Sequence, residues 1–207
     1  MSIAVKIRNG DPALISFFSG INGVRLSAPG AELRGIDLPM VTMQSLTESN
    51  ILIRDISRNK YTCEMTRDNV ALMDQMIFSS KGKIVTTALV CFSYMFRTSD
   101  PKVGCAVHVS SERVKEKAYH FRLVRTALST LRRLAPKSVI HAYISGGYVP
   151  QLGRHMVEML ADNRDLVKAI ARELLRQKVA IEAVEIGAMY RCQELGIGNG
   201  EFGFRLL

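Results

Sequence analysis

The clearest pattern along the chain is a pair of hydrophobic runs joined by a polar turn. Residues 84–96 and 103–109 are rich in β-branched and aromatic side chains, and Ser99-Asp100-Pro101 between them is typical of a turn. The pattern predicts an antiparallel hairpin that pairs Phe96 with Val103, which places Cys91 directly across from His108. Opposed residues share one face of a sheet, with Cβ atoms about 4.5–5.5 Å apart. We therefore expect the thiol and the imidazole to meet.

The second cysteine of the hairpin is the competing partner for this histidine. Cys105 lies three residues before His108 on the same predicted strand, so its side chain points to the opposite face. We therefore prefer Cys91 as the partner of His108. The alternative is that both residues are ordinary core residues, because free cysteine is often buried as a small hydrophobic side chain.

The rest of the chain after the hairpin alternates between helical and extended patterns. Apolar residues three and four positions apart predict a long helix that begins at Ser110 or Ser111 and ends before Pro136. The same reasoning predicts a second helix over 162–178 and strands over 138–144, 179–186 and 201–206. This order favours an α/β (α+β layered) fold in which helices pack on a mixed β-sheet.

The first 80 residues carry weaker patterns and no catalytic motif. Short strands are predicted over 4–7, 23–26 and 50–53, and an amphipathic helix over 68–78. We therefore divide the chain into an N-terminal segment, residues 1–80, whose role the sequence does not reveal and which we expect to pack on the core, and a domain over 81–207.

Composition narrows the class of protein. The chain has 207 residues, of which 47% are hydrophobic and 23% charged, as expected for an ordered protein with a real core. No run approaches 18 uninterrupted apolar residues, and the first residues lack a signal-peptide core. We therefore expect no membrane span and a cytoplasmic location.

The cysteines and histidines show no metal-binding spacing. The four cysteines form no CxxC pair and no repeated interval, which argues against a zinc site and against a disulfide framework. His120, His141 and His155 also lack such a spacing, so we assign them to structure or solvent. We expect reduced thiols, no metal and no organic cofactor.

The formal net charge of +9 suits an acidic protein partner. The basic residues are dispersed, and the densest group lies on a predicted helix, where it is usually a solvated face: Arg122, Arg125, Arg132 and Arg133. Because no nucleic-acid-binding module is recognisable, we do not expect the chain to bind nucleic acid.

Several motifs together resemble the CheD family of chemoreceptor glutamine deamidases, over about the C-terminal 60% of the chain. Cys91 and His108 have the family's seventeen-residue spacing between nucleophile and catalytic histidine. The next strand ends in the pair Gly146-Gly147, the following helix opens near residues 161–165, and a later strand closes at residues 185–188. The resemblance implies a Cys-His-Thr site that converts a glutamine of a protein substrate into glutamate.

The chemistry implied by this resemblance requires only side chains. A neighbouring histidine lowers the pKa of a cysteine thiol, so that Cys91 attacks the carboxamide as a thiolate while His108 transfers protons. The threonine is either Thr87, which strand alternation places on the same face as Cys91, or Thr86. Backbone N–H groups near Cys91 or Gly146 and Gly147 are candidates for stabilising the oxyanion.

The chain also departs from the family pattern. The family's Leu-Gly-Ser-Cys turn is replaced by Ala88-Leu-Val-Cys91, and Asp165 stands where asparagine is usual. Two alternatives to a chemoreceptor deamidase therefore stay open. One is a catalytically inactive interaction module with the same fold. The other is a secreted deamidase effector that acts on a host protein in the host cytosol.

Overall fold

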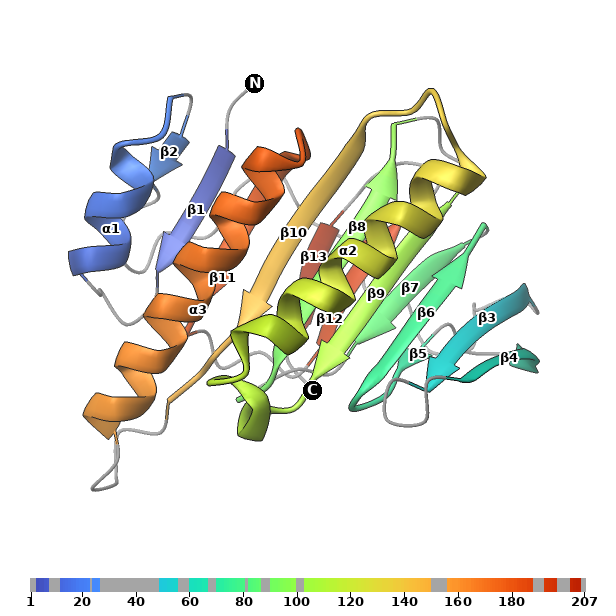
Figure 1. Cartoon of the computed structure of the whole chain (residues 1–207), viewed down its shortest axis with the longest axis horizontal. Helices are drawn as coiled ribbons and strands as arrows, with labels where there is room; N and C mark the ends of the chain where they lie inside the picture. The colour runs from blue at the N-terminus through green and yellow to red at the C-terminus, as the bar shows by residue number, and fades with distance from the viewer. Residues whose placement is uncertain are drawn as a thin grey trace.

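A computed structural model describes residues 3–7, 12–22, 24–26, 49–55, 60–66, 70–80, 82–86, 90–99, 103–149, 156–187, 192–196 and 202–205. Their strands form two β-sheets. The larger has nine strands in the order β2-β1-β11-β10-β8-β9-β6-β3-β4, and the smaller has four in the order β13-β12-β7-β5 (Figure 1). The larger sheet mixes parallel and antiparallel pairs, which confirms the predicted α+β class.

The elements have the following bounds: β1 Ile3–Ile7, α1 Pro12–Ser19, β2 Val24–Leu26, β3 Ser49–Asp55, β4 Lys60–Thr66, β5 Val70–Ala71, β6 Gln75–Ser79, β7 Lys83–Thr86, β8 Phe92–Thr98, β9 Gly104–Val109, a 3₁₀ helix Ser111–Arg113, α2 Lys117–Leu134, β10 Ile140–Gly146, α3 Met156–Arg176, β11 Ala180–Ile186, β12 Cys192–Gly196 and β13 Phe202–Arg205.

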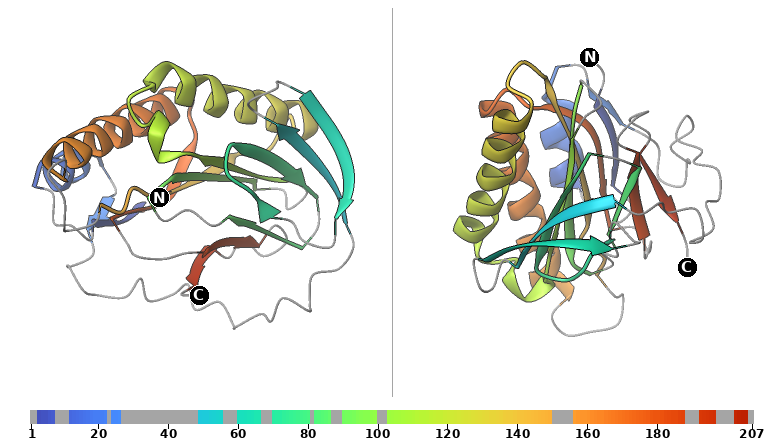
Figure 2. Two further views of the ribbon diagram at one scale, coloured as in Figure 1. Left: turned by 90° about the horizontal axis from the view of Figure 1, so that it is seen from below. Right: turned by 90° about the vertical axis from the view of Figure 1, so that its right-hand side faces the viewer.

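The molecule is built in three layers. All three labelled helices cover one face of the larger sheet, and β12, β13 and β7 lie against its other face (Figure 2). The helices pack there because each has an apolar stripe, which on α2 includes Leu123, Val124, Ala127, Leu128 and Leu131. The central strands β8, β9 and β10 of the larger sheet are therefore buried on both faces.

Each face of the larger sheet has its own core. Phe92, Tyr94 and Phe96 of β8 belong to the cluster beneath the helices. Met95, the residue between two of them in sequence, belongs instead to a smaller cluster with Ile84 and other side chains between the sheets. The period-2 alternation of β8 thus assigns its even-numbered residues to the helix side and its odd-numbered residues to the space between the sheets. Burying a large apolar side chain on either face contributes about 1.5–3 kcal/mol.

The predicted long strand over 84–96 is wrong in extent. Residues 83–86 form β7 of the smaller sheet, where they pair with β12, and β8 of the larger sheet begins only at Phe92. A continuous run of apolar residues does not reveal where the chain passes from one sheet to another, because strands of both sheets are buried.

The predicted helix over 68–78 is also wrong. The chain forms β5, a turn at Asp74 with φ of 58°, and β6. In β6 the side chains of Met76, Ile77 and Phe78 are all buried. Consecutive apolar residues of this kind fit either a two-sided strand or a short helix, so periodicity alone does not separate them.

The two long helices are confirmed with shifted starts. The Ser110 hydroxyl accepts a bond from the Glu112 N–H and so caps the 3₁₀ helix, whereas α2 itself begins at Lys117. Helix α3 begins at Met156, earlier than the predicted residue 162. Among the described residues, no helix is both long and apolar enough to span a lipid bilayer.

Both sheets contain strands from the first 80 residues. β1 pairs in parallel with β11, and β6 pairs antiparallel with β9, the strand that carries His108. The short β5 joins the smaller sheet through β7. The boundary near residue 80 stays a prediction.

Candidate active site

The strand register places Ser93, and not Cys91, directly across from His108. The predicted pairing is wrong by two residues because β8 continues to Thr98, whose N–H donates to the Val103 carbonyl at 3.0 Å, so the turn begins later than expected. A shift of two residues preserves the face of the sheet. Cys91 lies two residues before Ser93, so the side-chain alternation of β8, extended past Phe92, places Cys91 on the same side as Ser93 and His108.

Among the described residues, three buried polar side chains that face the space between the sheets each have an atom without a hydrogen-bond partner, and we call them the inter-sheet polar cluster: Thr86, Ser93 and His108. Each lies two residues from a member of the inter-sheet core on the same strand, namely Ile84, Met95 and Ala106. Thr86 and Ser93 have no measurable exposure, and His108 is 3% exposed. Thr86 Oγ1, Ser93 Oγ and His108 Nε2 have no hydrogen-bond partner among the described residues.

His108 is held as a neutral base. Its Nδ1 lies 3.3 Å from the carbonyl oxygen of Ala71, which only accepts hydrogen bonds, so Nδ1 carries the proton and Nε2 the lone pair. Burial lowers the pKa of His108, and the Ala71 hydrogen bond and the charge of Asp74 oppose this shift. Among the described residues, a basic nitrogen without a hydrogen-bond partner is thus buried inside the protein.

The structure brings one of the two candidate threonines close to this histidine. Thr86 of β7 pairs with Ala71 of β5, and the Ala71 carbonyl is the group that contacts His108. The Thr86 hydroxyl makes no hydrogen bond to His108, whose Nδ1 is oriented by the backbone. Thr87 lies outside the described residues.

Cys91 is a half-buried free thiol at the bend before β8. Its carbonyl accepts a hydrogen bond of 3.0 Å from the N–H of Gly147, which is therefore engaged in this structure. A Cβ on Gly146, which has φ of +111°, would lie 2.0 Å from the Cys91 oxygen. The Gly146-Gly147 pair is thus required for the close approach of β10 to Cys91.

No hydrogen bond joins Cys91 to His108, since Nδ1 contacts Ala71 and Nε2 has no partner among the residues that the structure describes. The other cysteine of the hairpin, Cys105, is fully buried on the helix side of the sheet, and burial raises the pKa of its thiol well above the ordinary value. Cys105 is therefore a core residue, and Cys91 is the thiol on the side of His108.

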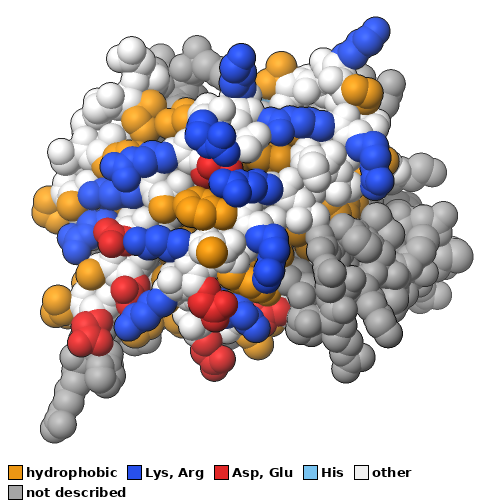
Figure 3. All heavy atoms as spheres, viewed as in Figure 1, with side chains coloured by type: hydrophobic (Ala, Val, Ile, Leu, Met, Phe, Trp, Pro, Cys, Tyr) orange, Lys and Arg blue, Asp and Glu red, His pale blue; other side chains and the backbone are white. Residues whose placement is uncertain are grey.

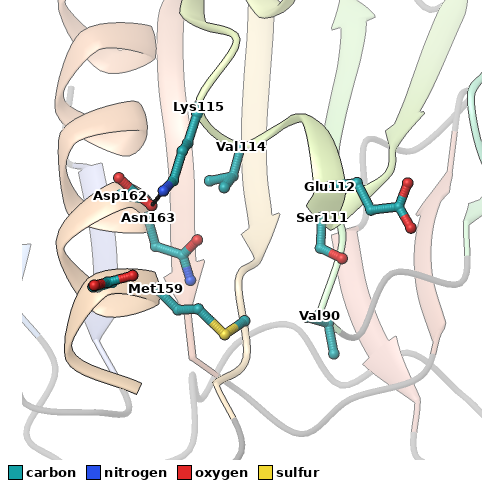
Figure 4. Close-up of a pocket in the computed structure, with 9 residues that line it drawn as sticks. Val90, Ser111, Glu112, Val114, Lys115, Met159, Asp162 and Asn163 are labelled. Atoms are coloured by element: carbon teal, nitrogen blue, oxygen red, sulfur yellow. Dashed lines mark ion pairs between the residues drawn. The ribbon is translucent and has the colours of Figure 1, made fainter. Parts of the chain in front are cut away.

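A cavity of about 360 Å³ opens on the helix side of the sheet, next to the residue before Cys91 (Figure 4). It lies between the first turns of α3 and the segment that precedes α2. It is lined by Val90, Ser111, Glu112, Val114, Lys115, Glu158, Met159, Asp162 and Asn163. Among the residues that the structure describes, no three His, Cys, Asp or Glu side chains gather as a metal ion would require.

Sequence reasoning missed three residues of this region. Ser93 would have followed from the correct strand ends, because it has the parity of Cys91. The Ala71 carbonyl has no signal in sequence, since any residue provides one. Asn163 lay within the motif compared with the CheD family, yet its contact with the Gly147 carbonyl depends on the packing of α3 against the end of β10.

No family model and no curated protein matches the sequence. One solved structure with a detectable similarity is the Neisseria meningitidis protein NMB0706, described by the family model DUF152. It is 11% identical, the match covers 55% of this chain and 52% of that one, and the TM-score is 0.32. The chain thus matches about half the length of that protein, and a similarity of this size supports no statement about activity.

Proposed function

We propose that the protein is a cysteine-dependent hydrolase that deamidates a glutamine side chain of a protein substrate, with Cys91 as nucleophile and His108 as general base. One observation carries this proposal. The Nε2 atom of His108 is buried, unprotonated and without a hydrogen-bond partner among the described residues, on the same face of the sheet as Cys91. Buried polar atoms are rarely left unpaired in structural positions. The CheD resemblance supports glutamine as the substrate group.

The reaction would proceed in two steps. His108 accepts the thiol proton, and the Cys91 thiolate attacks the carboxamide carbon, so that a C–S bond forms. The C–N bond then breaks, and ammonia leaves with a proton from the imidazolium. A water molecule gives a proton to His108 and attacks the thioester, which releases glutamate and restores the thiolate.

The positions of Cys91 and His108 on neighbouring strands determine which side chain must move for the reaction to occur. Diagonal neighbours across an antiparallel pair lie about 7–8 Å apart, a separation that an imidazole can span. His108 makes no hydrogen bond to Cys91 in this structure, so one of the two side chains must reorient. Cys91 lies just before the strand, at a bend, so a small change there can bring the thiol toward Nε2. Catalytic hydrogen bonds are often long without substrate and tighten when it binds.

The Ala71 carbonyl would orient the imidazole, the role that the third residue of a catalytic triad has. Because it holds the proton on Nδ1, Nε2 is the nitrogen available to the thiol. Thr86 is then a neighbour of this orienting group and not the direct partner of His108. We also propose a cytoplasmic location, where Cys91 stays reduced.

The pH dependence of cysteine alkylation tests the proposal without a known substrate. Each cysteine is alkylated in the native protein between pH 5 and 9, about the range over which a perturbed thiol titrates, and followed by peptide mass spectrometry. Cys91 should react faster than the other cysteines, and it should react at pH values below the ordinary thiol pKa. His108→Gln should remove this advantage. Cys105 is the internal control and should stay unreactive while the chain is folded, because it is fully buried. His141→Gln is the matched histidine control, because His141 lies on β10, which pairs with β8 on the side away from β9.

An unreactive Cys91, or equal alkylation in the wild type and His108→Gln, would show that the two side chains do not form a catalytic pair. A positive result justifies a search for protein glutamines whose conversion to glutamate depends on Cys91, scored against Cys91→Ala. The chemoreceptor and host-protein alternatives are then distinguished by the substrate found.

A second candidate function is binding of an acidic protein partner. Lys and Arg side chains spread over the outer surface of the helical layer (Figure 3), where α2 and α3 carry Arg122, Arg125, Arg132, Arg133, Lys168, Arg172 and Arg176. Such a surface attracts acidic partners at low ionic strength. Binding that weakens with salt and is unchanged in Cys91→Ala would support an interaction module without catalysis.

A further inference from the structure

The cavity on the helix side has one deeply buried polar side chain in its wall. Asn163 of α3 is 5% exposed, and its Nδ2 donates a hydrogen bond of 2.9 Å to the Gly147 carbonyl. This contact fixes the amide, because only the NH₂ end can donate. The other end, Oδ1, has no hydrogen-bond partner among the described residues, and in Figure 4 it points into the space between α3 and Val114. The cavity therefore contains a fixed acceptor that lacks a donor.

The charged side chains that line the cavity are mostly acidic, although the whole chain has a formal net charge of +9. Glu158 and Asp162 lie in the first two turns of α3, and Glu112 lies in the 3₁₀ helix across the cavity. Lys115 is the basic residue of the lining. In Figure 4 the Glu112 carboxylate extends away from Asn163, so it adds to the negative potential at the rim and makes no contact inside. Three carboxylates against one ammonium give a lining that attracts a cation.

A cation of the chain itself lies at the edge of this cavity. The Lys115 ammonium is 3.5 Å from a carboxylate oxygen of Asp162, and Figure 4 shows both side chains at the upper edge, above Asn163. The Lys115 side chain is 70% exposed, and ion pairs this exposed are weak. A cation that enters the cavity can therefore replace Lys115 at Asp162.

The rest of the inner wall is apolar. The side chains of Val90, Val114 and Met159 line it, and in Figure 4 the Met159 thioether extends beneath Asn163. Such walls suit a chain of methylene groups, which gains free energy when it leaves water. The volume of about 360 Å³ is at the lower end of the range of ligand sites and fits a short chain. Within the described ranges, no three His, Cys, Asp or Glu side chains converge as a metal ion requires, so the lining suits an organic cation.

We propose that this cavity binds a primary ammonium group on a short alkyl chain. The ammonium donates to Asn163 Oδ1 and to the Asp162 carboxylate, where it displaces Lys115. The methylene groups lie between Val114 and Met159. A lysine side chain of a protein partner and a free diamine both present this chemistry. The cavity lies on the helix side of the sheet, so the inference does not depend on the chemistry proposed between the sheets.

Titration of small amines into the full chain tests this inference. The probes are pentylamine and pentanol, which share an alkyl chain and differ in charge, and binding is followed through the methyl signals of Met159 and Val114 in methyl-labelled protein. Pentylamine should shift these signals in a saturable way at millimolar concentration. Pentanol should bind about tenfold more weakly, because it brings no charge to the carboxylates. Added salt should weaken the binding of pentylamine alone.

Two further probes distinguish the sources of the ammonium group. Acetyl-lysine methylamide presents the side chain as a protein does, and diaminopentane presents it with a second positive charge. Tighter binding of the lysine derivative would assign the cavity to a protein partner, and tighter binding of the diamine would assign it to a small molecule. Either result supports an ammonium site, whereas the failure of both to bind would reject it.

Variants that change the charge of the rim should alter the affinity in opposite directions. Asp162→Asn removes a carboxylate that contacts the ammonium and should weaken pentylamine binding about tenfold. Lys115→Gln removes the competing cation and should strengthen it about threefold. Glu116→Gln is the matched control, because Glu116 is paired with Arg113 and does not line the cavity, and it should bind pentylamine as the parent does.

Two variants on α3 locate the binding. Met159→Trp fills the cavity and should abolish the shift of the Val114 methyl signals. Val157→Trp is the control, because Val157 is 73% exposed and does not line the cavity. Equal affinity for pentylamine and pentanol, unchanged binding to Asp162→Asn or to Met159→Trp, or weaker binding to Lys115→Gln would each overturn the ammonium site. Carboxylates that only stabilise the positive end of the α3 dipole predict the first of these outcomes.

Discussion

A histidine is buried against each face of the larger sheet, and the two histidines differ in how many of their ring nitrogens have a hydrogen-bond partner. On the helix side, both ring nitrogens of His120 are paired: Nδ1 accepts from the Tyr94 hydroxyl at 2.8 Å, and Nε2 donates to the Arg113 carbonyl at 3.0 Å. Between the sheets, the Nδ1 of His108 is paired with Ala71, and its Nε2 has no partner in the part of the chain that the structure describes. Both histidines are almost inaccessible, so burial alone does not explain the difference.

This contrast separates a structural polar group from a candidate functional one. A buried polar group with all its partners fixes the packing around it, as His120 does where α2 meets β8. A buried group without a partner costs free energy, and the fold must offset that cost elsewhere. Four buried side-chain atoms of the described residues lack a partner: three belong to the inter-sheet polar cluster, and the fourth, the Tyr119 hydroxyl, lies on the helix side. The grouping of three such atoms is why we place the proposed chemistry between the sheets.

The largest expected effect comes from breaking the helix-side core. Phe96 of β8 has no measurable exposure and packs in the cluster beneath the helices. Phe96→Ala should lower the free energy of unfolding by about 3–5 kcal/mol, through lost burial and the cavity that remains. Urea denaturation followed by circular dichroism measures this change. A loss below about 1 kcal/mol would contradict the assignment of Phe96 to a close-packed core.

The next effect concerns protonation of His120. Burial lowers the pKa of His120 from 6.5 to about 4, against the opposing hydrogen bond to the Arg113 carbonyl. Because the folded pKa lies below the unfolded one, this contribution to stability is complete above pH 6.5 and is lost as the pH falls toward 4. The shift corresponds to about 3 kcal/mol. His108 has the same sign, because burial lowers its pKa too.

Urea denaturation between pH 7.5 and pH 4.5 measures this dependence. Glu173, whose pKa is lowered to about 2 chiefly by its hydrogen bond to Arg176 and next by Arg125, titrates below this window. His120→Gln should flatten the pH dependence of the free energy of unfolding, and His108→Gln should flatten it less. Parallel curves for the wild type and His120→Gln would show that this histidine is not the buried neutral group described.

Backbone geometry beside Cys91 provides a smaller effect. Gly146→Ala places a Cβ against the Cys91 carbonyl at a φ of +111°, and should lower the free energy of unfolding by about 1–3 kcal/mol. It should also change the alkylation rate of Cys91. Gly20→Ala is the matched control, since its added Cβ would have its nearest heavy-atom neighbour at 3.6 Å. Similar losses in both variants would remove the special role of Gly146.

The sequence predicts the α+β class, the two long helices and the hairpin of β8 and β9 that carries His108, because their periodicities are strong and local. It does not predict that residues 83–86 belong to a second sheet, since buried strands of both sheets have the same kind of composition. The register error at Ser93 has a related cause. The polar residues Arg97 and Thr98 read as a turn but extend β8 through pairing with β10, a contact distant in sequence.

The candidate site shows the same division. Spacing and residue type are enough to select Cys91, His108 and the Gly146-Gly147 pair. The structure places the glycines against Cys91. The Ala71 carbonyl that contacts His108 and the Asn163 amide that donates to the Gly147 carbonyl could not be selected in this way, because both contacts depend on how separate elements pack. Local signals thus select reactive residues, and tertiary contacts decide which of them have partners.

The smallest expected effect on stability is the sharpest test of the contrast between the two faces. Ser93 lies across from His108, and its hydroxyl has no hydrogen-bond partner in the described part of the chain. Ser93→Ala therefore removes a buried polar atom and none of the hydrogen bonds seen there. The free energy of unfolding should stay unchanged or rise by up to about 1 kcal/mol. If the cluster serves chemistry, the same variant should lower the alkylation advantage of Cys91 at acidic pH. A destabilised Ser93→Ala with unchanged Cys91 reactivity would make Ser93 an ordinary packing residue, and the inter-sheet face would then resemble the helix side.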